Sequence, residues 1–319
     1  MSHGWMVRAA CAAAAGAACA VVFACGGGNS TGPTPPPVTT TIPGDPFPTT
    51  TTTIPATASQ VFVGAGDIAM CDQLEPARQT GRLLSTIGGT VFALGDNAYF
   101  SGTAQEYRDC YNTTWGSERG RTRPVPGNHE YEGGNAAIPY FNYFGGNAGL
   151  PPQGYYSFEL GPAWHAIALN SNIPMAQNSP QGTWLRDDLA ANRSRCTVAY
   201  WHHPLFTSAQ NGPNPGTRDF WRLLYAAGAD LVLVGHDHIY ERFAPQDPDG
   251  RFDPPRGLRQ FTVGSGGAFL YNFVTVAANS EARIRSFGVL KLTLESSSYE
   301  WQFIQTNGAI ADSGVGQCH

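Results

Sequence analysis

Two histidines lie two residues apart in the segment Gly235-His236-Asp237-His238, directly after the apolar run 231–234. The apolar run predicts a buried strand, and the glycine after it predicts a turn that releases both imidazoles into a loop. Imidazoles at a strand end are typical of metal sites, but two nitrogens alone hold an ion weakly. Further ligands must therefore come from other segments of the chain.

Four earlier segments also end in side chains that can bind metal: Asp67, then Asp96 and Tyr99, then Asn128 and His129, and then His202 and His203. Carboxylate, amide oxygen, phenolate and neutral imidazole suit iron, manganese or zinc. Two such ions about 3.5–4 Å apart can share a carboxylate and clamp both the attacking and the leaving oxygen of a displacement at phosphorus. A pair of ions needs more ligands than one ion does, and this chain supplies them.

The motifs GD (66–67), GDNAY (95–99), GNHE (127–130), HHP (202–204) and GHDHIYER (235–242) occur in this order. Together they resemble the calcineurin-like metallophosphoesterase superfamily over about 61–242, followed by a β-rich tail. Most of that superfamily has Asp-x-His as its first motif, whereas Asp67 is followed here by Ile68 and Ala69. Tyr99 stands in place of the missing histidine, and in this the chain is similar to the purple acid phosphatase branch.

The resemblance implies a mixed α/β fold, a four-layer α/β/β/α sandwich whose two central sheets bring their strand ends together over the metals. It also implies two metal ions, iron together with iron, zinc or manganese. One ion would be held by Asp67, Asp96, Tyr99 and His238, and Asp96 would bridge to a second ion held by Asn128, His202 and His236. His129, with Glu130 behind it, and His203 would contact the substrate.

The activity that the resemblance implies is hydrolysis of small phosphate monoesters by in-line attack of a metal-bound hydroxide. Two alternatives stay open: a phosphodiesterase on the same fold, and a displayed binding module whose metals are structural. Plant and animal members of the branch usually carry a further histidine between the fourth and fifth motifs, and residues 206–217 contain none. The group that protonates the leaving alcohol is therefore not identified.

The first 57 residues are not expected to belong to the folded domain. Arg8 precedes the mostly apolar stretch 9–24, which is too short to span a membrane and is typical of a secretory signal. The segment ending at Cys25 resembles a bacterial lipoprotein signal, which implies a lipid anchor to the membrane on Cys25; ordinary cleavage is the alternative. We therefore expect a signal peptide over 1–24, a disordered Thr-, Pro- and Gly-rich tether over 25–57, and a metallophosphoesterase domain over 58–319.

This organisation predicts export to the cell surface or the extracellular space. Four cysteines follow Cys25, and in an oxidising compartment an even number suggests two disulfides. Of the three possible pairings we expect Cys71–Cys110 and Cys196–Cys318; metal binding by these thiols is the competing interpretation, which no CxxC spacing supports.

The overall composition limits the possible partners. A hydrophobic content of 42% is ample for a core, and the net charge is −5. Lys291 is the only lysine and the arginines are scattered, which argues against a nucleic-acid partner. The sequence does not indicate an oligomeric state.

The apolar patterns predict strands at 61–65, 90–94, 164–169, 197–201 and 231–234, and helices over 74–87, 182–192 and 219–227. An all-β tail is expected after residue 261, and 264–267 is expected to be a tight turn rather than a phosphate-binding nest.

Overall fold

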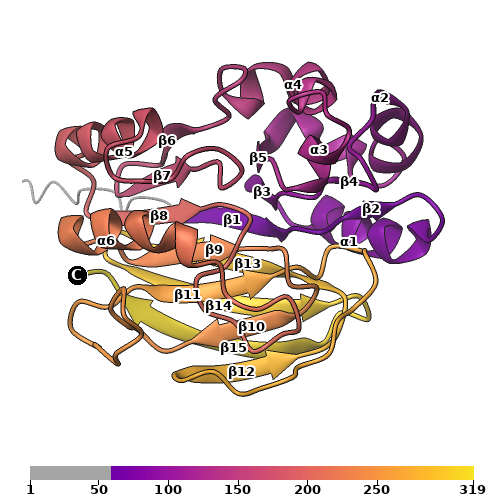
Figure 1. The fold of residues 1–319 in the computed structure, drawn as a ribbon. Coiled ribbons are helices and arrows are strands. Elements are labelled where there is room, and N and C mark those ends of the chain that lie inside the picture. Colours follow the sequence, from indigo (N-terminus) through magenta and orange to yellow (C-terminus); the bar gives the residue numbers. More distant parts are fainter. Residues whose placement is uncertain (1–58) are drawn as a thin grey trace, which may run out of the picture. The chain divides into compact units, whose positions relative to one another are not determined.

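The computed structural model describes residues 59–319 (Figure 1). The predicted signal peptide, tether and lipid-anchored Cys25 lie outside the described residues. Among the described helices, none has the length and apolar character needed to cross a membrane.

Two large sheets form the centre of the domain, and both combine parallel and antiparallel strands. The six-stranded sheet has the order β15 (Ile310–Gln317), β14 (Ser298–Gln305), β13 (Gly288–Leu294), β1 (Gln60–Ala65), β3 (Thr90–Leu94) and β5 (Thr122–Val125). The seven-stranded sheet has the order β12 (Ser280–Ile284), β10 (Tyr240–Phe243), β11 (Arg259–Val263), β9 (Leu231–Val234), β8 (Cys196–Tyr200), β7 (Trp164–Ala168) and β6 (Tyr156–Leu160). A small pair joins β2 (Ala69–Met70) to β4 (Ala98–Tyr99).

The strands that precede the predicted ligands run parallel to one another within each sheet. In the first sheet β1, β3 and β5 run parallel, and in the second β7, β8, β9 and β11 do. Parallel strands present their carboxyl ends at one edge of a sheet, where α/β proteins commonly place their sites.

The helices are α1 (Leu74–Thr86), α2 (Ala104–Glu106), α3 (His129–Glu132), α4 (Ile138–Phe144), α5 (Pro180–Ala191) and α6 (Arg218–Ala227). Shorter helical turns are η1 (Tyr107–Tyr111), η2 (Gly116–Arg121), η3 (Gly145–Ala148) and η4 (Pro215–Thr217). Local sequence explains two of the helix ends. The Ser179 side chain accepts a hydrogen bond from Gly182 N at the start of α5, and α6 ends at Gly228, whose φ of 73° suits glycine.

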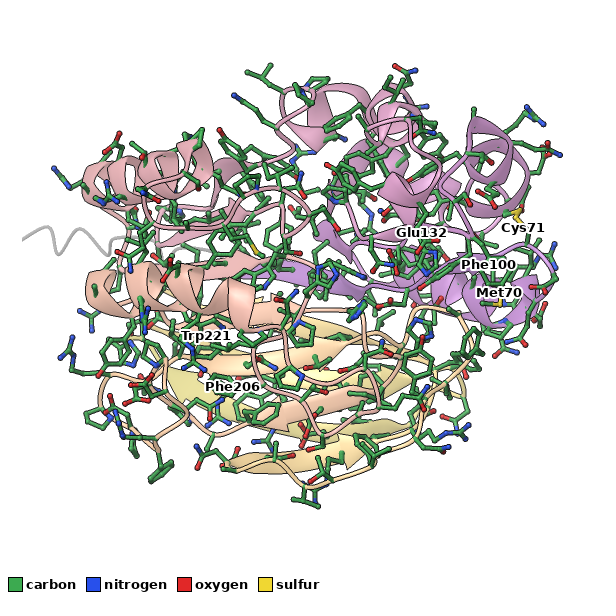
Figure 2. All side chains as sticks on the ribbon, viewed as in Figure 1. Met70, Cys71, Phe100, Glu132, Phe206 and Trp221 are labelled. Atoms are coloured by element: carbon green, nitrogen blue, oxygen red, sulfur yellow. A yellow bond between two sulfur atoms is a disulfide. The ribbon has the colours of Figure 1, made fainter. Side chains whose placement is uncertain are left out.

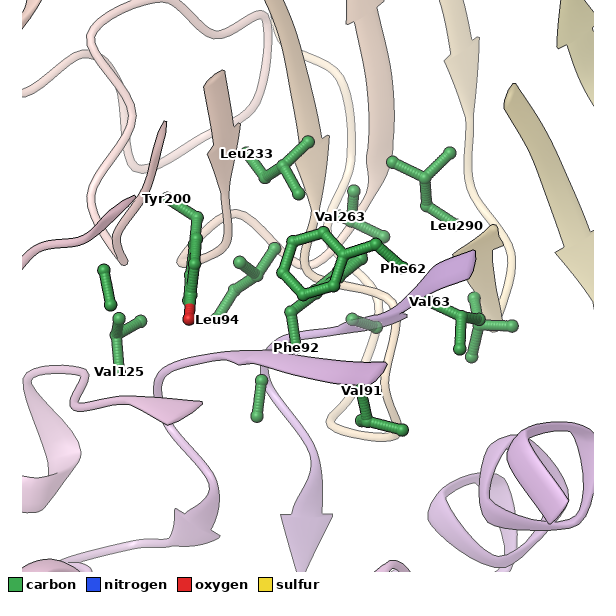
Figure 3. Close-up of a cluster of buried hydrophobic side chains, with 14 of the residues drawn as sticks. Phe62, Val63, Val91, Phe92, Leu94, Val125, Tyr200, Leu233, Val263 and Leu290 are labelled. Atoms are coloured by element: carbon green, nitrogen blue, oxygen red, sulfur yellow. The ribbon is translucent and has the colours of Figure 1, made fainter. Parts of the chain in front are cut away.

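Apolar side chains fill the space between the two sheets (Figure 3). Phe62 and Phe92 come from the first sheet, and Tyr200 and Leu233 come from the second. The rings of Phe62 and Tyr200 lie 5.6 Å apart across this interface. This packing sets the relative position of the sheets, and with it the distance between ligands on different sheets.

Helices cover the outer faces of the sheets. On the second sheet, α5 and α6 pack side by side over a separate apolar cluster that includes Trp221 and Val232. Trp221 also meets Phe206 at 5.0 Å (Figure 2). On the first sheet, α1 buries Ala77 and Leu84 in the same core as Val91. The predicted four-layer arrangement is therefore confirmed.

Both predicted disulfides are present. Cys71 is bonded to Cys110 with Cα atoms 5.2 Å apart, and Cys196 is bonded to Cys318 with Cα atoms 5.5 Å apart. The second bond attaches the carboxyl-terminal end of the chain to β8, a central strand of the second sheet.

Candidate metal centre

Three predicted ligands occupy an unusual backbone conformation immediately after their strands. Asp67 after β1, Asp96 after β3 and His236 after β9 have φ angles of 59°, 49° and 69°. Residues other than glycine rarely adopt a positive φ, because the side chain then crowds the backbone. Three such residues at one edge of the sheets indicate that the turns are shaped to direct their side chains toward one place.

The glycines of the motifs allow these turns to approach each other closely. A Cβ atom on Gly127 would lie 2.1 Å from Asp96 Oδ1, and a Cβ atom on Gly235 would lie 2.7 Å from Asp67 Oδ2. No larger residue fits there without movement of a carboxylate. The glycine that precedes a ligand in the motif therefore makes room for a ligand from another motif.

The side chains predicted to hold the first ion converge on the Tyr99 hydroxyl. This oxygen lies 3.0 Å from Asp67 Oδ1, 3.0 Å from His238 Nε2 and 3.3 Å from Asp96 Oδ2. His238 Nε2 is in turn 3.2 Å from Asp67 Oδ1. All four side chains are buried.

The side chains predicted to hold the second ion converge on His202 Nε2. That nitrogen lies 3.2 Å from Asp96 Oδ2, 3.1 Å from Asn128 Oδ1 and 3.2 Å from His236 Nδ1. Asp96 Oδ2 is thus close to both groups, as a bridging carboxylate must be.

Backbone carbonyls orient two of the imidazoles. The Nδ1 atoms of His202 and His238 each lie 2.7 Å from a carbonyl oxygen, that of Leu94 and that of Phe269 respectively. A carbonyl only accepts, so Nδ1 must donate, and a neutral ring then presents the lone pair of Nε2 to the cluster. His236 differs, because its Nδ1 faces His202.

The charge balance of the cluster fits bound cations. Burial lowers the pKa of His202, but the Asp96 and Asp67 carboxylates outweigh burial and raise it to about 9. Burial, with the same two carboxylates, raises the pKa of Tyr99 well above its ordinary value. These carboxylates therefore need a nearby positive charge, which a metal ion supplies while displacing protons from its ligands. Ligand atoms of Asp67, Asp96 and His202 lie within 4.8 Å of one another, and so do those of His202, His203 and His236.

The two predicted substrate-contacting histidines lie beside the cluster. His129 N donates to Asp96 Oδ1 at 2.9 Å, and its Nδ1 lies 2.6 Å from Phe100 O and 2.9 Å from Glu132 Oε2. Figure 2 shows Phe100 and Glu132 near each other. The His129 side chain is 22% exposed, with Nε2 3.7 Å from Asp96 Oδ2.

His203 lies on the His236 side of the cluster, with 4.5 Å between ring centroids. Its Nδ1 is 2.8 Å from Ser171 Oγ. Burial and the neighbouring His202 lower the pKa of His203 to about 2, so this ring is neutral.

Glu130 connects the loops that carry the ligands. Its buried carboxylate accepts hydrogen bonds from Asp96 N at 3.0 Å, Asn97 N at 2.9 Å, Gly127 N at 2.7 Å and Tyr107 Oη at 2.9 Å. Burial and the nearby Asp96 raise the pKa of Glu130 to about 7. The Glu130 carboxylate therefore fixes the loops of the second and third motifs relative to each other.

Arg242, the last residue of the fifth motif, makes contacts between the two sheets. It bonds Asp312 on β15 at 2.7 Å and lies over the Trp301 ring on β14 at 4.9 Å. Since Arg242 belongs to β10, these contacts join one sheet to the other.

Two backbone amides of residues 264–267 donate to backbone carbonyls. Gly264 N donates to Ile239 O, and Gly266 N donates to Gly66 O. These two donors are not available to phosphate, which argues against a phosphate-binding nest, but the segment forms a bend rather than the expected tight turn between strands.

Two side chains outside the predicted set also border the cluster. The Tyr271 ring stacks on the His238 ring. The Asn211 side chain donates a hydrogen bond to the backbone carbonyl of His236. Neither belongs to a motif, and no local pattern in the sequence distinguishes them.

The family model that describes the calcineurin-like phosphoesterases matches residues 62–240, which is more than half of the chain. The chain belongs to the calcineurin-like phosphoesterase family. The resemblance expected from the motifs is thereby confirmed, and the relatives below confirm its purple acid phosphatase branch.

Within this calcineurin-like family the chain is similar to purple acid phosphatase 21 of Arabidopsis thaliana, with 30% identity over 226 residues, covering 65% of this chain and 49% of the relative. It is also similar to mouse tartrate-resistant acid phosphatase type 5, with 22% identity over 208 residues, covering 56% of this chain and 63% of the relative. The solved structure of a purple acid phosphatase from yellow lupin seeds superposes with a TM-score of 0.71 at 21% identity, covering 82% of this chain and 54% of that one. The chain thus spans about half the length of several relatives.

Proposed function

We propose that this calcineurin-like phosphoesterase is a metal-dependent phosphatase that hydrolyses small phosphate monoesters. The observation that carries the proposal is the pair of ligand groups around Tyr99 and His202, which share Asp96. The names of its relatives, which are acid phosphatases, support the same activity.

The first group, Asp67, Asp96, Tyr99 and His238, would hold one ion, and Asp96, Asn128, His202 and His236 would hold the other. Iron together with iron, zinc or manganese suits this mixture of oxygen and nitrogen ligands. When bound, the ions supply Lewis acidity toward phosphate oxygens and lower the pKa of coordinated water.

The remaining side chains position the substrate. Phe100 O and Glu132 accept from His129 Nδ1, so a ring that also carries a proton on Nε2 would donate it to a phosphoryl oxygen. His203 N donates to Ser171 Oγ, and when that hydroxyl in turn donates to Nδ1, the neutral ring carries its proton on Nε2 and can donate it. Both histidines would stabilise the charge that develops on phosphate oxygens.

Comparison of two esters tests the substrate class. We expect kcat/KM for p-nitrophenyl phosphate to exceed that for bis(p-nitrophenyl) phosphate by at least about 10-fold, equivalent to about 1.4 kcal/mol of transition-state stabilisation. The two compounds share a leaving group, so the ratio reports the recognition of a monoester. A clear preference for the diester would overturn this choice and favour the phosphodiesterase alternative.

Visible spectroscopy tests the proposed role of Tyr99. If Tyr99 binds ferric iron as a tyrosinate, the iron-loaded protein is expected to show a ligand-to-metal charge-transfer band. Tyr99→Phe keeps the ring and removes the donor oxygen, so the band should disappear. A band that persists in the phenylalanine variant would exclude Tyr99 as its source.

The fold alone does not distinguish a hydrolytic enzyme from a binding protein. A protein described as the anchor in the inner membrane complex of Plasmodium also superposes on this chain, with a TM-score of 0.61 at 15% identity. What supports an enzyme here is the convergence of both ligand groups, since a purely structural module has no need for a pair of ions with His129 and His203 beside it.

A further inference from the structure

The side chain of Tyr271 lies flat on a proposed metal ligand. Its ring and that of His238 are stacked with centroids 4.0 Å apart and planes 7° from parallel. Tyr271 N also donates to His238 O at 3.0 Å. Since Phe269 O binds His238 Nδ1, the segment 269–271 fixes His238 through both its ring and its backbone.

Asn211 holds the other end of Tyr271. The Asn211 side chain lies near the Tyr271 hydroxyl and counteracts part of the rise in its pKa, and Asn211 Nδ2 donates to His236 O at 3.1 Å. Asn211 N donates to Asp237 Oδ1 at 3.3 Å. Asn211 therefore connects the loop of the fifth motif to Tyr271. It lies within residues 206–217, the segment that lacks the histidine expected from the resemblance.

These contacts place Tyr271 beside both ligand groups. The Tyr271 ring lies over His238, in the first ligand group, and the neighbouring Asn211 is bonded to the backbone of His236 in the second group. The side chain is partly exposed, and burial together with the charge of Asp67 raises the pKa of its hydroxyl to about 12, so the phenol keeps its proton. A ligand bound over both groups would therefore meet this hydroxyl.

We propose that Tyr271 is a further substrate-contacting residue, whose hydroxyl donates a hydrogen bond to an oxygen of the phosphoryl group, and that Asn211 is its positioning residue. The inference rests on the proposed phosphatase function. A phenol donates to an anionic oxygen without adding a charge to the site, and hydrogen bonds to charged groups are stronger than those between neutral groups.

The competing explanation is structural: the ring merely packs against His238. Tyr271→Phe separates the two roles, because phenylalanine keeps the stacked ring and removes only the hydroxyl. Tyr271→Leu removes both, and Asn211→Ala leaves the hydroxyl in place without its partner.

Calorimetric titration of inorganic phosphate into the metal-loaded proteins tests the proposal. For Tyr271→Phe we expect the Kd of phosphate to rise about 10-fold or more, as for loss of a hydrogen bond to a charged group. Metal content and Tm should equal those of the parent protein. Asn211→Ala should weaken phosphate binding less, and Tyr271→Leu should also lose metal.

A phosphate Kd within about twofold of the parent value in Tyr271→Phe would overturn the inference, and so would loss of metal in that variant. The titration needs no turnover. If the parent protein bound phosphate but hydrolysed no ester, the proposed function would fail, while the Kd ratio would still decide the role of Tyr271.

Discussion

Replacing Asn128 or His202 by alanine is expected to lower kcat for p-nitrophenyl phosphate by at least about 100-fold, since losing even an indirect partner of a metal ligand commonly costs 10- to 100-fold. Asn128 Oδ1 and His202 Nε2 lie 3.1 Å apart, and both face the second ligand group. Either substitution leaves Asp67, Tyr99 and His238 intact. We therefore expect elemental analysis to show a fall from two bound ions to one.

Asn142→Ala is a matched control for this experiment. Asn142 is exposed on α4, outside the cluster, so its removal should leave kcat and metal content unchanged. Full activity in Asn128→Ala or His202→Ala, with two ions retained, would contradict the assignment of the second ligand group.

Glu130→Ala is expected to lower the free energy of unfolding by at least about 4 kcal/mol, because five donors lose their acceptor and each buried unsatisfied group costs roughly 1–3 kcal/mol. Four of these donors are backbone amides of the second and third motifs, and the fifth is the Tyr107 hydroxyl. The loops that present Asp96 and Asn128 lose their common tie, so activity should fall as well. Chemical denaturation measures the effect.

Glu132→Ala, on the same short helix, is the control for stability. Glu132 is exposed, and its removal should change the free energy of unfolding by no more than about 0.5 kcal/mol. Glu130→Gln should still be destabilising, because its amide group places a donor against the backbone donors. A stability within about 1 kcal/mol of the parent in Glu130→Ala would show that these hydrogen bonds are dispensable.

Several strands that carry the candidate site could be predicted because their signals are local. β1, β3 and β9 are short apolar runs, each followed by a glycine and a polar residue. A buried strand and a turn depend mainly on such neighbouring residues. Helices α1 and α6 could also be predicted from local sequence, because their apolar residues recur at helical spacing.

Strand β15 illustrates what could not be predicted individually. Ile310–Gln317 is largely exposed, and it has only three apolar residues and includes two glycines. It forms a strand because it pairs along β14 at the edge of the first sheet. The ion pair of Arg242 with Asp312 depends on the same pairing, so a motif residue acquires its partner from a segment 70 residues away.

The sequence by itself determined which side chains can bind metal, their order along the chain and the strands that end in them. These are properties of single residues and their immediate neighbours. Only the tertiary structure decided that Asp96 lies close to both ligand groups, that His202 and His238 present Nε2, and that Tyr271 covers His238. Those relations depend on how two sheets pack, and the packing joins segments that are far apart in the chain.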